Sequence, residues 1–182
     1  MKKIAVIVGS TRHGSWNRAI AEDLVSMLPD GYEAEFLSIA DLPFYDQDWD
    51  TPEAIPAAVT ELRAKADAAD GFIITTPEYN RSMSAVLKNA LDILSRPYGA
   101  QTFSGKPTLV ASASPGGFGG FGAIRDLRNV LAFLDAQVIA QPEIYLSFIH
   151  NLYVENKLND DTAAFLRTAV AKFVAAFPPE AK

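Results

Sequence analysis

The stretch IAVIVGSTRHGSWNR, residues 4–18, decides the fold class of this chain. Its first five residues are all apolar, which is typical of a strand in a parallel sheet whose two faces are both covered. Gly9 then permits a sharp turn, and apolar residues at helical spacing begin at Trp16. A strand that runs through a short loop into a helix is the first half of a βαβ unit, so the stretch predicts an α/β protein.

The same alternation of strand and helix continues along the chain. The segments that read as strands are residues 3–8, 33–39, 71–75, 107–112 and 137–140. The clearest helical stripe runs from Phe165 to Phe177, and we expect Asp160 and Asp161 to cap its helix. Five strands and five helices joined by right-handed crossovers predict a flavodoxin-like three-layer sandwich, with a five-stranded parallel sheet in the order 2-1-3-4-5. We expect one domain over residues 1–182.

Composition excludes several kinds of site. The chain has no cysteine, which excludes disulfides, thiol nucleophiles and cysteine-bound metals. His13 and His150 lie far apart and neither accompanies a G-x-S-x-G motif, so we expect no metal site and no Ser-His-Asp triad. The net charge is −6 without a basic run, so nucleic acid is not an expected partner. No stretch approaches the roughly 20 apolar residues of a membrane span, so we expect no membrane partner and a cytoplasmic protein.

The loop after the first strand offers a site for an anion. In a sheet of this order, ligands bind beyond the carboxyl ends of the strands, where the loops after strands 1 and 3 meet. Ser10, Thr11 and Ser15 provide hydroxyl groups, and the next helix directs its free N–H groups at the loop. Arg12 can add a charge-assisted contact. The alternative is that Ser15 only caps the helix and that Arg12 is solvated.

The loops after the third and fourth strands suggest a flat ligand beside that anion. In residues 76–82, TPEYNRS, Pro77 ends strand pairing, Tyr79 brings a ring to the ligand edge, and Ser82 is expected to cap the next helix. The alternative is a capped loop with an exposed tyrosine. Five of residues 116–122 are glycines, which allows the main chain to approach a flat ligand. Their G-x-G-x-x-G pattern is no dinucleotide fingerprint, because it lies outside the first βα turn.

Together these segments resemble the NADPH-dependent FMN reductase family, which includes bacterial quinone, chromate and azo-dye reductases. The matching segments are GSTRHGSWNR, DLPFYDQD, TPEYNRSMSAVLKNALDILSRP, GKP, and LRNVLAFLDA followed by QPE. The resemblance implies non-covalent FMN whose phosphate and ribityl chain are held by Ser10, Arg12, Ser15 and Asn17. It implies an isoalloxazine ring lined by Pro77, Glu78, Tyr79 and Asn80, with Ser114 and Gly116 at the other edge. Relatives commonly place an arginine after the Gly-Gly of the third loop, where this chain has Phe121 and Gly122.

The resemblance also implies an activity. Electrons would pass from NADPH or NADH through FMN to a small-molecule acceptor such as a quinone, an azo compound, chromate or free flavin. No catalytic side chain is expected, because the redox chemistry belongs to the cofactor. The family forms homodimers or homotetramers whose interfaces border the flavin. Two alternatives stay open: a flavodoxin-type electron-transfer protein without NAD(P)H oxidation, against which Arg12 and the modest charge argue, and a nucleotide- or phosphate-binding protein without flavin.

Overall fold

The central sheet of the computed structural model, which describes residues 1–51, 55–100 and 102–178, has six strands. They are β1 (Lys2–Val8), β2 (Tyr32–Leu37), β3 (Gly71–Thr75), β6 (Pro107–Ala113), β7 (Gln137–Val138) and β8 (Ile144–Leu146). They pair in parallel in the order β2-β1-β3-β6-β7, and β8 pairs with the carboxyl end of β6. The predicted order 2-1-3-4-5 is therefore confirmed.

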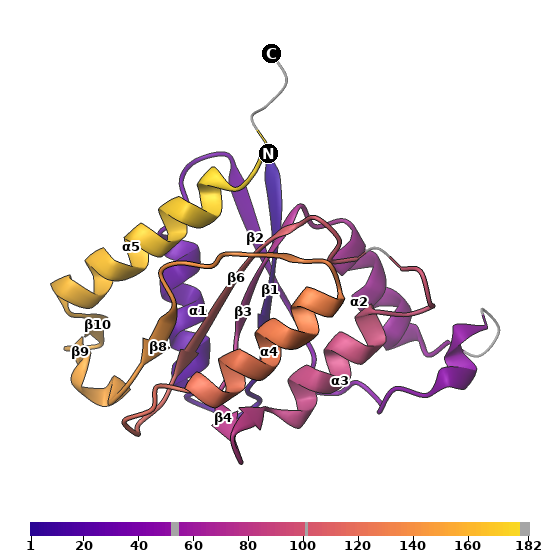
Figure 1. The fold of residues 1–182 in the computed structure, drawn as a ribbon, viewed down its shortest axis with the longest axis horizontal. Coiled ribbons are helices and arrows are strands. Elements are labelled where there is room, and N and C mark those ends of the chain that lie inside the picture. The colour runs from indigo at the N-terminus through magenta and orange to yellow at the C-terminus, as the bar shows by residue number, and fades with distance from the viewer. Residues whose placement is uncertain (52–54, 101, 179–182) are drawn as a thin grey trace.

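Helices cover both faces of this sheet. They are α1 (Trp16–Ser26), α2 (Ala57–Asp67), α3 (Ala85–Leu94), α4 (Phe121–Phe133) and α5 (Asp160–Ala175). Figure 1 shows α1 and α5 on one face, and α2, α3 and α4 on the other. The alternation of β1 produces this division, because Ile4 and Val6 pack into the core beneath α1 and α5, whereas Ala5 and Ile7 pack into the core beneath the other three helices. The sequence prediction of a three-layer sandwich is confirmed.

Short elements occupy the connections. A hairpin of β4 (Glu78–Tyr79) and β5 (Ser82–Met83) follows β3, and a second one of β9 (Tyr153–Val154) and β10 (Lys157–Leu158) precedes α5. The 3₁₀ helices are η1 (Gln47–Asp50) and η3 (Ile149–Asn151). The predicted surface loop 41–56 contains η1, and its residues 52–54 lie outside the described part of the chain.

The predicted fifth strand, 137–140, is wrong in its extent. Pairing beside β6 stops at Val138 and resumes further along the chain as β8, from Ile144. Pro142 lies in the intervening segment and has no N–H to donate to a ladder, so the outermost position of the sheet is shared by two short strands. β8 matters for the site because it supports the loop that follows β6.

Two predicted helix caps are also wrong. Ser84, not Ser82, caps α3: its hydroxyl accepts from the N–H of Leu87, whereas Ser82 belongs to β5. Asn159 caps α5 by accepting from Thr162 N, and this leaves Asp160 and Asp161 in the first helical turn. In both cases the sequence offers neighbouring residues that are all good caps, and tertiary packing decides which one ends the loop.

Within the residues that the structure describes, no helix is long and apolar enough to cross a bilayer. The cytoplasmic location stays a prediction.

Candidate functional site

The loops after β1, β3 and β6 meet at one edge of the sheet. Gly9 donates its N–H to the carbonyl of Thr75 at 2.7 Å, and a Cβ at Gly9 would lie only 2.9 Å from the hydroxyl oxygen of Thr76. The hydroxyl of Ser112, near the end of β6, donates to the carbonyl of Thr76 at 2.6 Å. The three loops predicted to share one site are therefore in direct contact with one another.

The first loop places a cation beside the N-terminus of α1. Ser15 is the N-cap, and its hydroxyl accepts from the backbone N–H of Arg18 at 3.4 Å. The exposed guanidinium of Arg12 folds back onto the carbonyl of Gly14 at 2.7 Å, and Ser10 accepts from the N–H of Arg12. The first turn of α1 contains no acidic residue, so nothing there neutralises the positive end of the helix dipole. These features suit an anion.

Asn17 joins α1 to the end of β6. It is buried, and its side-chain amide makes two 3.0 Å hydrogen bonds with Ala113, donating to the carbonyl and accepting from the N–H. Its own carbonyl accepts from the hydroxyl of Thr75. Both polar atoms of the Asn17 side-chain amide are therefore bonded within the protein. The contribution of Asn17 to the site is to hold the first turn of α1 against β6.

The second loop is the β4–β5 hairpin. Tyr79 pairs with Ser82, and the two residues between them, Asn80 and Arg81, have φ of 52° and 68°. Such a left-handed pair is typical of a two-residue hairpin turn. Pro77 precedes the hairpin, and the Tyr79 ring is 54% exposed. The hairpin therefore presents an aromatic ring to solvent beyond the carboxyl end of β3.

Glu78 fixes this hairpin to α4. Its Oε2 accepts from the backbone N–H of Gly122 at 2.7 Å and of Ala123 at 3.4 Å, and its Oε1 pairs with the Arg81 guanidinium at 2.8 Å. A Cβ at Gly122 would lie 2.8 Å from the carbonyl oxygen of Arg81. Gly122 is therefore packed so closely against the hairpin that a side chain there would meet the Arg81 backbone.

The third loop, which follows β6, is packed against β6 and β8 on one side and is open at Gly116. Ser114 donates its N–H to Leu146 in β8, and its hydroxyl accepts from Gly116 N at 3.1 Å. A Cβ at Gly120 would lie 1.7 Å from the Ser112 hydroxyl oxygen, whereas one at Gly116 would meet only Ser114, at 3.6 Å. The main chain around Gly116 can thus be approached closely by a ligand.

These residues fit FMN. A phosphate would meet hydroxyls, Arg12 and an unneutralised helix N-terminus, and a planar ring would meet the exposed Tyr79 and the open main chain at Gly116. Among the described residues, no three His, Cys, Asp or Glu side chains form a group that could hold a metal ion. Burial raises the pKa of Tyr45, Tyr145 and Tyr153, and all three lie outside these loops.

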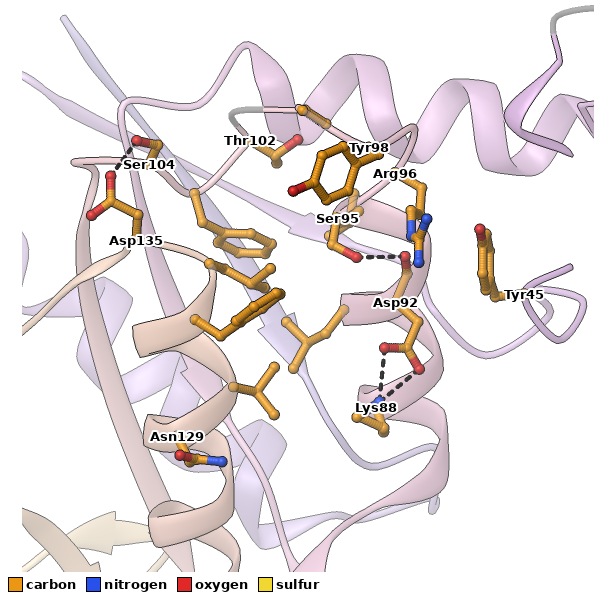
Figure 2. Close-up of a pocket in the computed structure, with 18 residues that line it drawn as sticks. Tyr45, Lys88, Asp92, Ser95, Arg96, Tyr98, Thr102, Ser104, Asn129 and Asp135 are labelled. Carbon is orange, nitrogen blue, oxygen red and sulfur yellow. Dashed lines mark hydrogen bonds and ion pairs between the residues drawn. The ribbon is translucent and has the colours of Figure 1, made fainter. Parts of the chain in front are cut away.

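Two features of the structure were not predicted from the sequence. One is the contact between Arg81 and Phe118 beside the site, for which the only sequence signal is a phenylalanine flanked by glycines. The other is a cavity of about 980 Å³ between α3 and α4 (Figure 2). It is bordered by Phe133 and Tyr98, which are 86% and 91% exposed. Phe133 is at the end of α4 and Tyr98 is in the irregular segment after α3, so no sequence periodicity indicates that the two border one cavity.

Comparison with known proteins agrees with the site. The family model described as NADPH-dependent FMN reductase matches residues 2–151. A quinone reductase of Pseudomonas putida is 43% identical over 171 residues, covering 93% of this chain and 91% of that protein. A quinone reductase of Escherichia coli K12 is 42% identical over 82% of this chain and 79% of its own length. The structure of FerB, a flavoenzyme NAD(P)H:(acceptor) oxidoreductase from Paracoccus denitrificans, superposes with a TM-score of 0.88 at 34% identity, covering 96% of each chain.

Proposed function

We propose, since the chain belongs to the NADPH-dependent FMN reductase family, that its acceptors are quinones and related small electrophiles. The chain is an oxidoreductase that uses FMN and NAD(P)H. The observation that carries the proposal is the convergence of three loops on one edge of the sheet, with Arg12 at one end and the exposed Tyr79 at the other. The names of the curated relatives support quinones as the acceptor class.

Each loop has a distinct part in this proposal. Ser10, Arg12 and Ser15, together with the first-turn N–H groups of α1, hold the phosphate. Asn17 holds α1 against β6, so that this helix N-terminus points at the site. When bound, FMN supplies the two-electron chemistry between NAD(P)H and the acceptor.

The remaining residues orient the planar part of the ligand. Pro77, Glu78, Tyr79 and Asn80 line one edge, and Ser114 and Gly116 line the other. Glu78 keeps the two sides at a fixed separation, because its carboxylate bonds the N-terminus of α4. The N–H groups of Ser114, Gly116, Phe121 and Gly122 are bonded within the protein. Backbone N–H groups near Tyr79 and in residues 117–120 therefore stabilise negative charge that develops on the ligand. No side chain transfers a proton in this account.

Anaerobic stopped-flow absorbance tests the proposal. NADPH or NADH should bleach the yellow colour of the FMN-loaded protein, and a quinone should then restore it. Bleaching by neither nucleotide would leave the electron carrier as the better interpretation. A colourless protein that takes up no added FMN would favour the phosphate-binding protein without flavin. An acceptor panel with both nucleotides then ranks quinones, azo compounds, chromate and free flavin.

We also infer that the chain assembles with copies of itself through the face formed by α3 and α4. Phe133 and Tyr98 are both largely exposed and border the cavity between these helices; Figure 2 labels Tyr98. An exposed apolar surface around a cavity is typical of an interface. The family resemblance, which implies homodimers or homotetramers, supports a second copy as the occupant. The number of copies is left to measurement.

A further inference from the structure

An aromatic platform lies beside the candidate site. Phe118, in the glycine-rich loop, is 67% exposed, and Phe148 packs its ring edge near Gly117, where a Cβ would lie 3.2 Å away. A third exposed aromatic residue, Tyr79, is on the β4–β5 hairpin that also carries Arg81. Exposed aromatic rings bury large areas when another flat ring stacks on them.

The platform carries one cation. The guanidinium carbon of Arg81 lies 4.5 Å from the centre of the Phe118 ring, and the Arg81 side chain is 68% exposed. A guanidinium over an aromatic face is held in place by the ring's quadrupole while its outer N–H groups still face solvent. Arg81 therefore presents a positive charge next to an apolar surface.

The ion pair between Glu78 and Arg81 leaves the Arg81 guanidinium able to bind a second anion. Glu78 binds Arg81 through Oε1, but its Oε2 is bonded by the N–H of Gly122, at the N-terminus of α4. The carboxylate thus keeps a stabilising partner when Arg81 turns toward another anion. The Arg81 side chain is 68% exposed and the Glu78 side chain only 10%, so the buried carboxylate depends on the N–H groups of Gly122 and Ala123, whereas the guanidinium is open to solvent. We therefore expect only a small free-energy cost when Arg81 exchanges Glu78 for an anionic group of a ligand.

The glycine-rich loop cannot withdraw Phe118 from this position. Cβ atoms at Gly119 and Gly120 would lie 2.7 Å from the Tyr145 carbonyl carbon and 1.7 Å from the Ser112 hydroxyl oxygen, so the back of the loop is packed against β8 and β6. Both glycines have positive φ, a backbone conformation that residues with a side chain rarely adopt. The ring of Phe118 is consequently directed away from this packed side.

We propose that Arg81 and Phe118 form an acceptor subsite that favours aromatic acceptors carrying a negative charge. The proposal rests on the function proposed above and states which electron acceptors the same site prefers. The acceptor ring lies against Phe118 and its anionic group binds the Arg81 guanidinium. In the overall reaction, NAD(P)H, one proton and a quinone give NAD(P)⁺ and the quinol; the quinone gains two electrons and two protons. Arg81 keeps its proton throughout.

Two acceptors that differ in charge test this subsite, naphthoquinone sulfonate and the neutral menadione. With FMN-loaded Arg81→Gln, kcat/KM for naphthoquinone sulfonate should fall about tenfold, the loss expected for one charge-assisted hydrogen bond. The value for menadione should change less than about twofold, since menadione has no group for the guanidinium to bind. Arg81→Lys should recover part of the loss, and high salt should reduce the preference of the wild type.

Arg18→Gln is the matched control. Arg18 also pairs with a glutamate, Glu22, at 2.7 Å and lies 3.8 Å from the centre of a phenylalanine ring, Phe36, but it is on α1. The Arg18→Gln variant should leave the ratio of kcat/KM for naphthoquinone sulfonate to kcat/KM for menadione unchanged. Phe118→Leu should weaken both acceptors, since both stack on the ring. An equal loss for both acceptors in Arg81→Gln, or no loss for either, would overturn the subsite.

Direct binding separates this proposal from the function itself. The affinity of the FMN-loaded protein for naphthoquinone sulfonate, measured by equilibrium dialysis without NAD(P)H, should fall about tenfold in Arg81→Gln. This measurement decides the subsite even if the wild type oxidises no NAD(P)H, a result that would refute the proposed function instead. Equal affinities of the wild type and Arg81→Gln would refute the subsite. Unchanged FMN affinity in Arg81→Gln is required, because a loss of FMN would place the arginine at the cofactor.

Discussion

Arg12 is the residue on which anchoring of the cofactor phosphate depends most. It is the cation of the first loop, and its guanidinium rests on the Gly14 carbonyl within that loop. Arg12→Ala should raise the dissociation constant of FMN about tenfold or more, because a charge-assisted contact to phosphate is lost. Titration of the apoprotein with FMN, followed by quenching of FMN fluorescence, measures this. Arg18→Ala should leave the affinity unchanged; an unchanged affinity in Arg12→Ala would remove Arg12 from the phosphate site.

At the scale of single residues, the sequence indicates local features such as helix starts more readily than hydrogen bonds between distant residues. Ser15 was recognised as a hydroxyl at a helix start, and the structure places it there as the N-cap. The double hydrogen bond of Asn17 to Ala113 joins residues 96 positions apart, and no local pattern announces such a contact. The same holds for Glu78, whose partners at the start of α4 become neighbours only after β3 and β6 pair.

The glycine-rich loop shows how an element can be predicted for an incomplete reason. Its glycines suggested close approach by a ligand, and Gly116 is indeed open. Gly119, Gly120 and Gly122 instead face protein: a side chain there would strike Tyr145, Ser112 or Arg81. The density of glycine therefore reflects packing against β8, β6 and the β4–β5 hairpin at least as much as ligand binding. Sequence cannot separate these causes, because both require the same missing Cβ.

Gly120→Ala should destabilise the fold more than Gly116→Ala. The new Cβ at residue 120 would overlap the buried Ser112 side chain at 1.7 Å, and the φ of 84° is unfavourable for alanine. We expect the free energy of unfolding to fall by about 2–4 kcal/mol. Gly116→Ala, whose Cβ would meet only Ser114 at 3.6 Å, should change it by less than about 1 kcal/mol. Urea denaturation followed by circular dichroism measures both, and similar losses would contradict this account of the loop.

For the whole molecule, the topology was predictable because it follows from simple periodicity. Continuous apolar runs at 71–75 and 107–112 indicated strands covered on both faces, and right-handed crossovers then left few possible orders. The surface between α3 and α4 was not predictable in this way. The cavity there depends on how Phe133, at the end of α4, lies relative to Arg96 and Tyr98, which belong to the segment that follows α3. Figure 2 shows Arg96 and Tyr98 on that segment. The proposed interface is therefore a feature of the folded surface that sequence periodicity does not reveal.

Phe133→Asp tests assembly at this scale. Phe133 is on α4, borders the cavity and is 86% exposed, so a charge there should leave the isolated chain folded while it opposes burial of this face against a second copy. Size-exclusion chromatography with light scattering should show a shift from oligomer to monomer, with an unchanged circular dichroism spectrum. Val154→Asp, at a 63% exposed apolar residue of β9, is the control and should leave the mass unchanged. An intact oligomer in Phe133→Asp would place the interface on another face, and a monomeric wild type would refute assembly altogether.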